Sequence, residues 1–152
     1  MINTNALFEI AEVSISYKFG RYTADRNKIC SSSCVFEIGR EVAKDHIEHH
    51  ECFYIMMLNN SNQVLGVSKL SQGGITGTLV DMRIMFQNII KSNATAFIML
   101  HNHPSGTLRP SEADKSLTAK AKKAAETLDI KLLDHVIITS ESYFSFADEG
   151  II

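Results

Sequence analysis

The stretch TAFIMLHNHPSGTLRPSEAD, residues 95–114, decides most of the fold that the sequence predicts. Its first part, Thr95–His101, is apolar almost throughout, which is typical of a strand covered on both faces. Pro104 and Gly106 end that strand and turn the chain. A helix is then predicted from Ser111 to about Leu128. The stretch therefore joins the end of a buried strand to the start of a helix.

Strand and helix patterns alternate on both sides of this stretch. Cys52–Leu58 is apolar at both parities and is predicted as a second strand covered on both faces. The turn cluster 59–62 joins it to a strand over 63–70 as a hairpin. Strands interleaved with helices predict an α/β fold, a mixed β-sheet flanked by helices. The other predicted elements are a strand over 7–17, a loop over 18–33, helices over 35–50 and 79–91, and strands over 132–139 and 143–147. The inner face of the helix after Ser111 is predicted to hold Ala113, Leu117, Ala121, Ala124 and Leu128.

Size and composition suit a single globular domain. The chain has 152 residues, of which 45% are hydrophobic and 21% charged, and this mixture can bury a core. We divide it into an N-terminal arm, residues 1–34, and one domain, residues 35–152. The net charge of -2 gives no support to bulk electrostatic capture of nucleic acid.

Cysteine content and hydropathy indicate the compartment. The chain has three cysteines, and an odd, low number argues against a disulfide framework. No N-terminal stretch has the form of a signal peptide, and no apolar run reaches the roughly 18 residues of a membrane-spanning helix. We therefore expect a cytoplasmic protein that has no membrane partner.

Two histidines at the end of the central strand are candidate metal ligands. His101 and His103 are two residues apart, so their side chains project to the same side of a strand. Asp114 lies in the first turn of the next helix and adds a carboxylate. Two histidines and one carboxylate leave a coordination position open, which is the catalytic arrangement for zinc, whereas structural sites have four protein ligands. Zinc lowers the pKa of water to about 7 and polarises a carbonyl group. Iron, manganese and nickel also accept these ligands.

The same residues have a simpler interpretation. A His-x-His pair alone is weak evidence for a metal. Ser111 followed by Asp114 is also the pattern of a capping box, and the helix dipole favours an acid at that position. The two interpretations are compatible, because an aspartate at a helix start can bind a metal while a serine caps the helix.

The spacing resembles the JAMM metalloprotease motif, which runs His-x-His, seven residues, Ser, two residues, Asp. Here the seven residues are 104–110 and the two are 112–113. A closer resemblance is to the bacterial RadC family. It is carried by the strings HNHPSG (101–106), PSEAD (110–114), LLDHVIIT (132–139) and YFSFADEG (143–150), and covers about residues 35–152.

The resemblance implies a fold, a metal and roles for five residues. The fold would be of the JAMM type, related in architecture to cytidine deaminases. His101, His103 and Asp114 would bind Zn2+. Ser111 would help to hold the oxyanion of the tetrahedral intermediate. Glu51, immediately before the strand 52–58, would be the general base. Only the resemblance selects Glu51; otherwise it is a solvated glutamate at a strand edge.

Three functions follow as hypotheses. The first is a zinc-dependent metallopeptidase or isopeptidase that cleaves a peptide or protein substrate. The second is a DNA-repair-associated module that binds or cuts DNA. The third is a non-catalytic binding domain with a structural zinc. Longer RadC proteins carry an N-terminal helix-hairpin-helix region that binds DNA, and this chain begins too late to contain it, which weakens the second hypothesis. Deaminase chemistry is not expected, because position 103 is His rather than the Glu of the deaminase H-x-E motif and no P-C-x-x-C motif is present. The apolar strand edges and the arm permit a homodimer.

Several other polar groups favour structural interpretations. His46, His49, His50 and Glu51 form a histidine-rich patch that we interpret as an exposed helix end, with adventitious metal binding as the alternative. Cys30 and Cys34 are interpreted as plain thiols, and Arg83 as a structural residue. His135 is a hydrogen-bonded core residue or a group that orients a zinc ligand. The basic helix face of Lys115, Lys120, Lys122 and Lys123 is interpreted as solvated, with contact to nucleic acid as the alternative.

Overall fold

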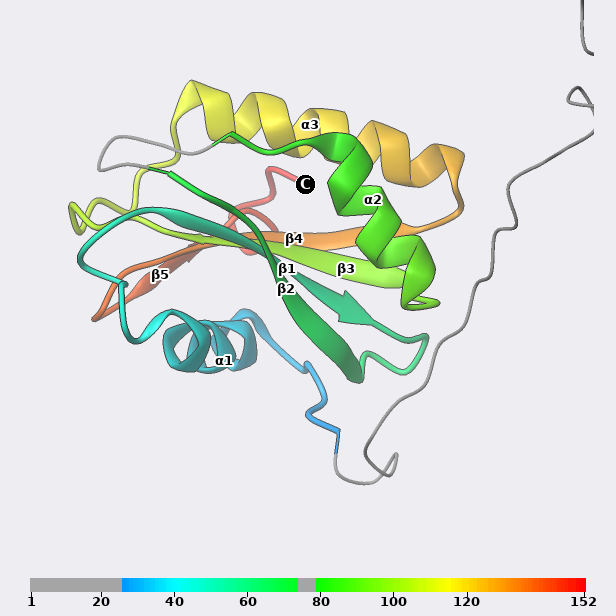
Figure 1. Ribbon diagram of the computed structural model, residues 1–152, viewed down its shortest axis with the longest axis horizontal. Coiled ribbons are helices and arrows are strands. Elements are labelled where there is room, and N and C mark those ends of the chain that lie inside the picture. Colours follow the sequence, from blue (N-terminus) through cyan, green and yellow to red (C-terminus); the bar gives the residue numbers. More distant parts are fainter. Residues whose placement is uncertain (1–25, 74–78) are drawn as a thin grey trace, which may run out of the picture.

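A five-stranded mixed sheet forms the centre of the fold, in a computed structural model that describes residues 26–73 and 79–152. The strand order is β2-β1-β3-β4-β5, and only β3 and β4 pair in parallel. The predicted α/β class with a mixed, helix-flanked sheet is confirmed (Figure 1). The elements are α1 (Ser32–Ala43), β1 (Cys52–Leu58), β2 (Val64–Gln72), α2 (Met82–Lys91), β3 (Ala96–Asn102), α3 (Glu112–Thr127), β4 (Lys131–Ile138) and β5 (Tyr143–Ser145).

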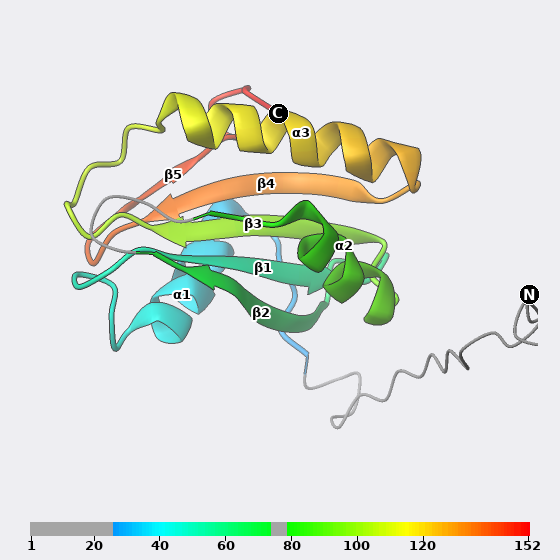
Figure 2. The ribbon, with the colours of Figure 1, turned by 45° about the horizontal axis from the view of Figure 1, so that its top comes forward.

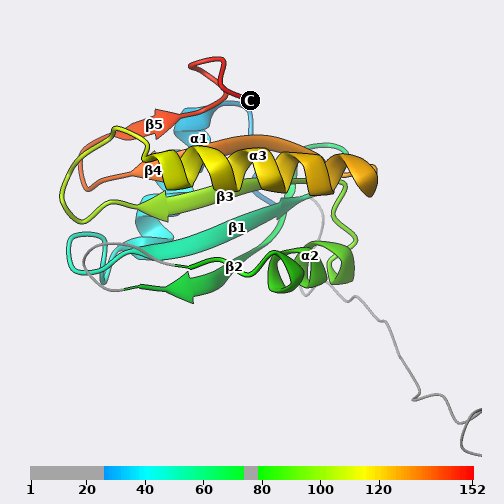
Figure 3. The same ribbon diagram turned by 90° about the horizontal axis from the view of Figure 1, so that it is seen from above.

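Helices cover both faces of the sheet. Helix α1 lies on one face, and helices α2 and α3 lie on the other (Figures 2 and 3). Every residue of β1 and β3 is buried. This agrees with the sequence, in which both the odd and the even positions of these strands are apolar. Alternate residues of these strands therefore enter two separate cores. Tyr54 packs in the core under α1, and its neighbour Phe53 packs in the core under α2 and α3.

The register of the central strands places His101 in the second core. Strand β1 pairs antiparallel with β3, so that Phe53 is opposite His101. The two rings stack with centroids 5.5 Å apart. On its other side β3 pairs in parallel with β4, which places His135 opposite Met99. The carboxyl end of β3 is thus enclosed by β1 and β4 and faces α3.

Helix α1 differs from the prediction at both ends. It begins at Ser32, inside the predicted loop, and ends at Ala43 rather than near residue 50. Residues 44–49 form turns instead. The side-chain amide of Asn102 donates to the carbonyl oxygens of Ile47 and His50, each at 2.9 Å. These bonds hold the returning segment against the sheet, and a continued helix would not bring the chain back to β1.

The buried face of α3 matches the prediction in the middle of the helix and differs at its ends. Of the five predicted residues, Ala121 is buried and Leu117 and Ala124 pack against the core, whereas Ala113 and Leu128 are exposed. Thr118 and Ala125 are buried as well. The helix is turned so that Thr118 faces the sheet. Tertiary contacts with polar partners, described below, account for this difference.

Parts of the predicted organisation lie outside the described residues. These are the strand over 7–17 and the first half of the loop over 18–33. The division between an arm, 1–34, and a domain, 35–152, stays a prediction. Among the helices that the structure describes, none is long and apolar enough to cross a membrane.

Candidate metal centre

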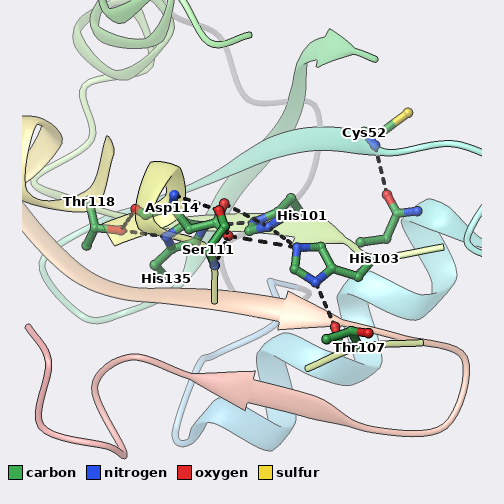
Figure 4. Close-up of polar contacts among 9 residues, drawn as sticks. Cys52, His101, His103, Thr107, Ser111, Asp114, Thr118 and His135 are labelled. Carbon is green, nitrogen blue, oxygen red and sulfur yellow. Dashed lines mark hydrogen bonds and ion pairs between the residues drawn. The ribbon is translucent and has the colours of Figure 1, made fainter. Parts of the chain in front are cut away.

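The end of β3 and the start of α3 bring three potential metal ligands together (Figure 4). Nε2 of His101 lies 2.9 Å from Nε2 of His103. Oδ1 of Asp114 lies 3.3 Å from Nε2 of His101, and Oδ2 lies 3.9 Å from Nε2 of His103. The side chain of His101 is completely buried, whereas those of His103 and Asp114 are 15% and 13% exposed. Solvent therefore reaches the group from the side of His103 and Asp114.

A chain of hydrogen bonds behind His101 determines which of its nitrogens carries a proton. The Thr118 hydroxyl donates to the carbonyl oxygen of Asp114 at 2.6 Å, so it accepts from Nδ1–H of His135, 2.7 Å away. Burial holds the pKa of His135 well below its usual value, so the ring is neutral and its Nε2 carries a lone pair. That lone pair accepts from Nδ1–H of His101 at 2.8 Å. Nε2 of His101 is therefore left with a lone pair that faces His103.

The protonation of His103 follows from a single contact. Nδ1 of His103 lies 2.6 Å from the carbonyl oxygen of Thr107. A carbonyl oxygen only accepts, so Nδ1 carries the proton and Nε2 carries the lone pair. Both histidines thus direct an unprotonated Nε2 at the same point.

This arrangement fits a metal ion. Two nitrogen lone pairs 2.9 Å apart repel each other unless a cation, a proton or a metal ion, lies between them. The separations of 2.9 Å between the two nitrogens and 3.3 Å from Oδ1 of Asp114 to Nε2 of His101 lie close to the value of about 3.4 Å expected for ligands about 2.1 Å from a tetrahedral ion. Two imidazoles and one carboxylate suit zinc and other transition metals.

Ser111 and Asp114 form the capping box that the sequence pattern indicated. The Ser111 hydroxyl oxygen accepts from the Asp114 N–H at 3.1 Å. Oδ2 of Asp114 accepts from the N–H of Ser111 at 2.7 Å and from its hydroxyl at 2.6 Å. These bonds hold Oδ2 on the serine and leave Oδ1 directed at His101.

The pKa of the Asp114 carboxyl lies well below its usual range. Burial would raise this pKa, but the two hydrogen bonds from Ser111 and a positive charge between Asp114 and the imidazoles, either a proton on His101 or a metal ion, favour the ionised form and lower it. Asp114 is therefore a carboxylate, the form that binds a cation.

Glu51 immediately precedes β1 and makes no hydrogen bond or ion pair with this group. The pairing of β1 with β3 ends at Phe53↔His101, and the same register continued by two residues would place Glu51 opposite His103. Opposed residues of an antiparallel pair share a face of the sheet, so Glu51 would then be on the face of the candidate ligands. Its carboxylate makes no hydrogen bond or ion pair with the residues that the structure describes, and its carbonyl oxygen accepts from the N–H of Gly73 at 2.9 Å.

Thr118 belongs to the site and Asn102 lies between its two histidines in the sequence, and sequence reasoning selected neither. Thr118 lies four residues after Asp114 on the same helix face, which is the one signal that could have identified it. Asn102 lies between the two histidines and points to the opposite face of the sheet, where it bonds the segment before β1.

Three other predicted groups are placed outside the site. Arg83 pairs with Asp81 at 3.2 Å beside the start of α2, which supports its structural interpretation. Lys115 pairs with Glu112 at 2.7 Å, so part of the basic face of α3 is neutralised locally. Cys30 and Cys34 are free thiols, and no group of potential ligands in the described part of the chain includes them.

An α/β domain that presents two imidazole nitrogens and a carboxylate with room for a further ligand fits the class of metal-dependent hydrolases. The family comparison agrees with this class. The model of the RadC-like JAB domain matches residues 29–151, and the chain belongs to this family. Membership supports a metal-dependent hydrolase of the JAMM type, for which His101, His103 and Asp114 are candidate ligands.

Similar proteins come from several bacteria, and the name of each is UPF0758 protein. One from Flavobacterium johnsoniae is 50% identical over 124 residues, which cover 82% of this chain and 53% of that protein. One from Porphyromonas gingivalis is 44% identical over 103 residues, 67% of this chain and 45% of that protein. One from Chlorobaculum parvum is 34% identical over 145 residues, 95% of this chain and 64% of that protein. The chain spans about half the length of the first two relatives.

Proposed function

We propose that this domain is a zinc-dependent metallopeptidase or isopeptidase. One observation carries the proposal: the hydrogen bonds of His101 and His103 leave both Nε2 lone pairs directed at one point, next to an ionised Asp114. A capped helix or a hydrogen-bonded core does not need two lone pairs that face each other.

His101, His103 and Asp114 would hold the ion. Zinc bound there would supply Lewis-acid chemistry, which polarises a carbonyl group and acidifies water. Glu51, placed on the same sheet face by the continued register, would take a proton from the attacking water and deliver it to the leaving amine. Ser111 would donate a hydrogen bond from its hydroxyl to the oxyanion, and for this the hydroxyl must release Oδ2 of Asp114, which it contacts at 2.6 Å.

The number of candidate metal positions favours a carbonyl substrate over a phosphodiester. Many nucleases use two metal ions about 3.5–4 Å apart. In the part of the chain that the structure describes, the group of His101, His103 and Asp114 has no second group of ligands on its own face of the sheet. A single ion suits the hydrolysis of a peptide or isopeptide bond, as in zinc peptidases.

The test combines metal content with cleavage. Protein purified without a histidine tag is analysed by mass spectrometry, beside a His101→Ala/His103→Ala double variant. Peptide and isopeptide libraries are then screened with the zinc-loaded protein and with Glu51→Gln. We expect the double variant to lose the zinc of this site, and Glu51→Gln to keep zinc but to lose cleavage by at least about 100-fold.

Other outcomes contradict the proposal in different ways. Cleavage that survives in Glu51→Gln would remove the general base and favour another mechanism. Bound zinc without cleavage of any peptide or isopeptide would favour the non-catalytic domain. Salt-sensitive binding of DNA through the lysines of α3, lost on their replacement, would favour the DNA-associated module.

We also propose that the protein acts in the cytoplasm. Its three cysteines are free in the structure, as expected in a reducing compartment. A labelled form found in a secreted fraction would contradict this proposal.

A further inference from the structure

A second group of metal-ligating side chains lies on the other face of the sheet. His46, His50 and Cys52 each offer one ligand atom, and these atoms all lie within 4.8 Å of one another. Cys52 packs in the core under α1, whereas Phe53 packs on the face of His101. The sheet therefore separates this group from the candidate metal centre.

The fold holds the group through one buried side chain. Asn102 is completely buried. Its carbonyl oxygen accepts from the N–H of Cys52 at 2.9 Å, and its amide donates to the carbonyl oxygens of Ile47 and His50. The backbone of His50 and that of Cys52 are thus fixed to the same residue of β3. The segment 44–50 then places the ring of His46 next to that of His50, with centroids 4.9 Å apart.

A neighbouring hydroxyl group positions one ring of the group. The hydroxyl of Tyr54 bonds to Nε2 of His46 and restrains the ring.

We propose that His46, His50 and Cys52 form a second metal site, which takes a borderline or soft transition-metal ion such as zinc. One thiolate and two imidazoles are ligands that zinc prefers, and a water molecule would complete a tetrahedron. Binding converts the Cys52 thiol into a metal-bound thiolate, and the thiol proton passes to solvent. This site differs from the first in having sulfur among its ligands.

The second site has a consequence for Glu51, which rests on the function proposed above. Glu51 lies between His50 and Cys52 in the sequence. An ion held by both neighbours would restrain the backbone on either side of the proposed general base. Filling the second site is then expected to raise kcat and to leave the metal affinity of the first site unchanged.

Cobalt(II) absorption tests the second site separately from the first. A cysteine thiolate bound to cobalt gives a charge-transfer band in the near ultraviolet, and two histidines with an aspartate give none. The titration uses a Cys30→Ser/Cys34→Ser chain, so that Cys52 is the remaining thiol. We expect the band to saturate in this chain and equally in the same chain carrying His101→Ala/His103→Ala.

Variants of the group complete the experiment. Cys52→Ser is expected to abolish the band. His46→Ala and His50→Ala change partly exposed residues. Each is expected to weaken cobalt binding by at least about tenfold, because replacing even a residue that only orients a metal ligand has an effect of this size. The matched control is His49→Ala: His49 bonds to His50 but is outside the group, and the band should persist.

Two results would overturn the proposal. One is the absence of a thiolate band in the starting chain at saturating cobalt. The other is unchanged cobalt affinity in both His46→Ala and His50→Ala, with circular dichroism showing that each is folded. Failure of the first site alone would instead leave the thiolate band intact and abolish only metal binding by His101 and His103.

Discussion

The hydroxyl of Thr118 determines which nitrogen of His101 carries a lone pair, although it reaches His101 only through His135. It accepts from His135, which accepts from His101, and every proton in this chain has one consistent place. Without the hydroxyl, His135 can adopt its other tautomer, whose Nε2–H donates to Nδ1 of His101 and leaves the proton of His101 on Nε2. At the scale of single residues, the ability of the site to bind a metal ion therefore depends on which ring nitrogens carry protons.

Replacing Thr118 with valine tests this chain. The Nδ1–H of His135 would lose its acceptor in a buried place, which should cost about 1–3 kcal/mol of unfolding free energy. Zinc affinity at His101 should fall by about 10–100-fold. Urea unfolding and a competition titration with a zinc chelator measure the two effects. Thr118→Ser keeps the hydroxyl and should retain zinc affinity; equal zinc affinity in Thr118→Val would refute the role of the chain.

Ser111 has two separable roles, in capping α3 and in the proposed chemistry. Ser111→Ala should lower the unfolding free energy by about 1 kcal/mol, because the helix loses its capping acceptor, whereas Ser111→Gly should cost only a few tenths. Both variants lack the hydroxyl and should lose peptide cleavage to a similar extent. Denaturant unfolding and initial rates check this prediction. If activity follows stability across the two variants, Ser111 acts only as a cap.

At the scale of elements, the close approach of α1 to the sheet depends on Gly39. A Cβ atom at this position would lie 3.0 Å from Cδ2 of Leu100 and 3.3 Å from Cδ1 of Ile138. The helix therefore packs directly on β3 and β4, the two strands that carry His101 and His135. This contact sets the distance between the helix layer and the sheet.

A valine at position 39 should force these layers apart. We expect Gly39→Val to lower the unfolding free energy by about 1–3 kcal/mol through overpacking. The control is Gly66→Ala in β2, where a Cβ atom meets only Cε of Met57 at 3.7 Å, an ordinary contact. Thermal and urea unfolding of both variants check the prediction. Equal losses in the two variants would show that the close contact at Gly39 is not limiting.

At the scale of the whole molecule, metal binding should stabilise the folded domain. An ion that binds only the folded state, at 100 times its dissociation constant, contributes about 2.7 kcal/mol. For a chain of 152 residues this corresponds to a Tm higher by about 5–10 °C. The measurement is thermal unfolding of a Cys52→Ser chain with zinc and with a chelator. The shift should vanish in the same chain with His101→Ala/His103→Ala, and a shift that survives there would assign the ion to another place.

Much of the fold could be read from local patterns. Cys52–Leu58 is a strand with the predicted bounds, because seven apolar residues can be buried on both faces of a sheet. The predicted start of α3 at Ser111 is correct to within a residue, because capping is a local interaction. The extent of α1 was wrong, because its end depends on Asn102, a residue far along the chain that captures carbonyl groups of the following turns.

The sequence alone determined the donor set, two histidines and an aspartate at a strand end and a helix start, because strand parity and helix capping act over a few residues. Only the tertiary structure decided where the lone pairs point, because the tautomer of His101 depends on His135 in β4 and Thr118 in α3. The tertiary structure also brought Cys52 to His46, which the sequence showed only as part of a histidine-rich helix end. Side chains from separate elements come into contact only after the sheet has formed, so a local sequence pattern does not predict these contacts.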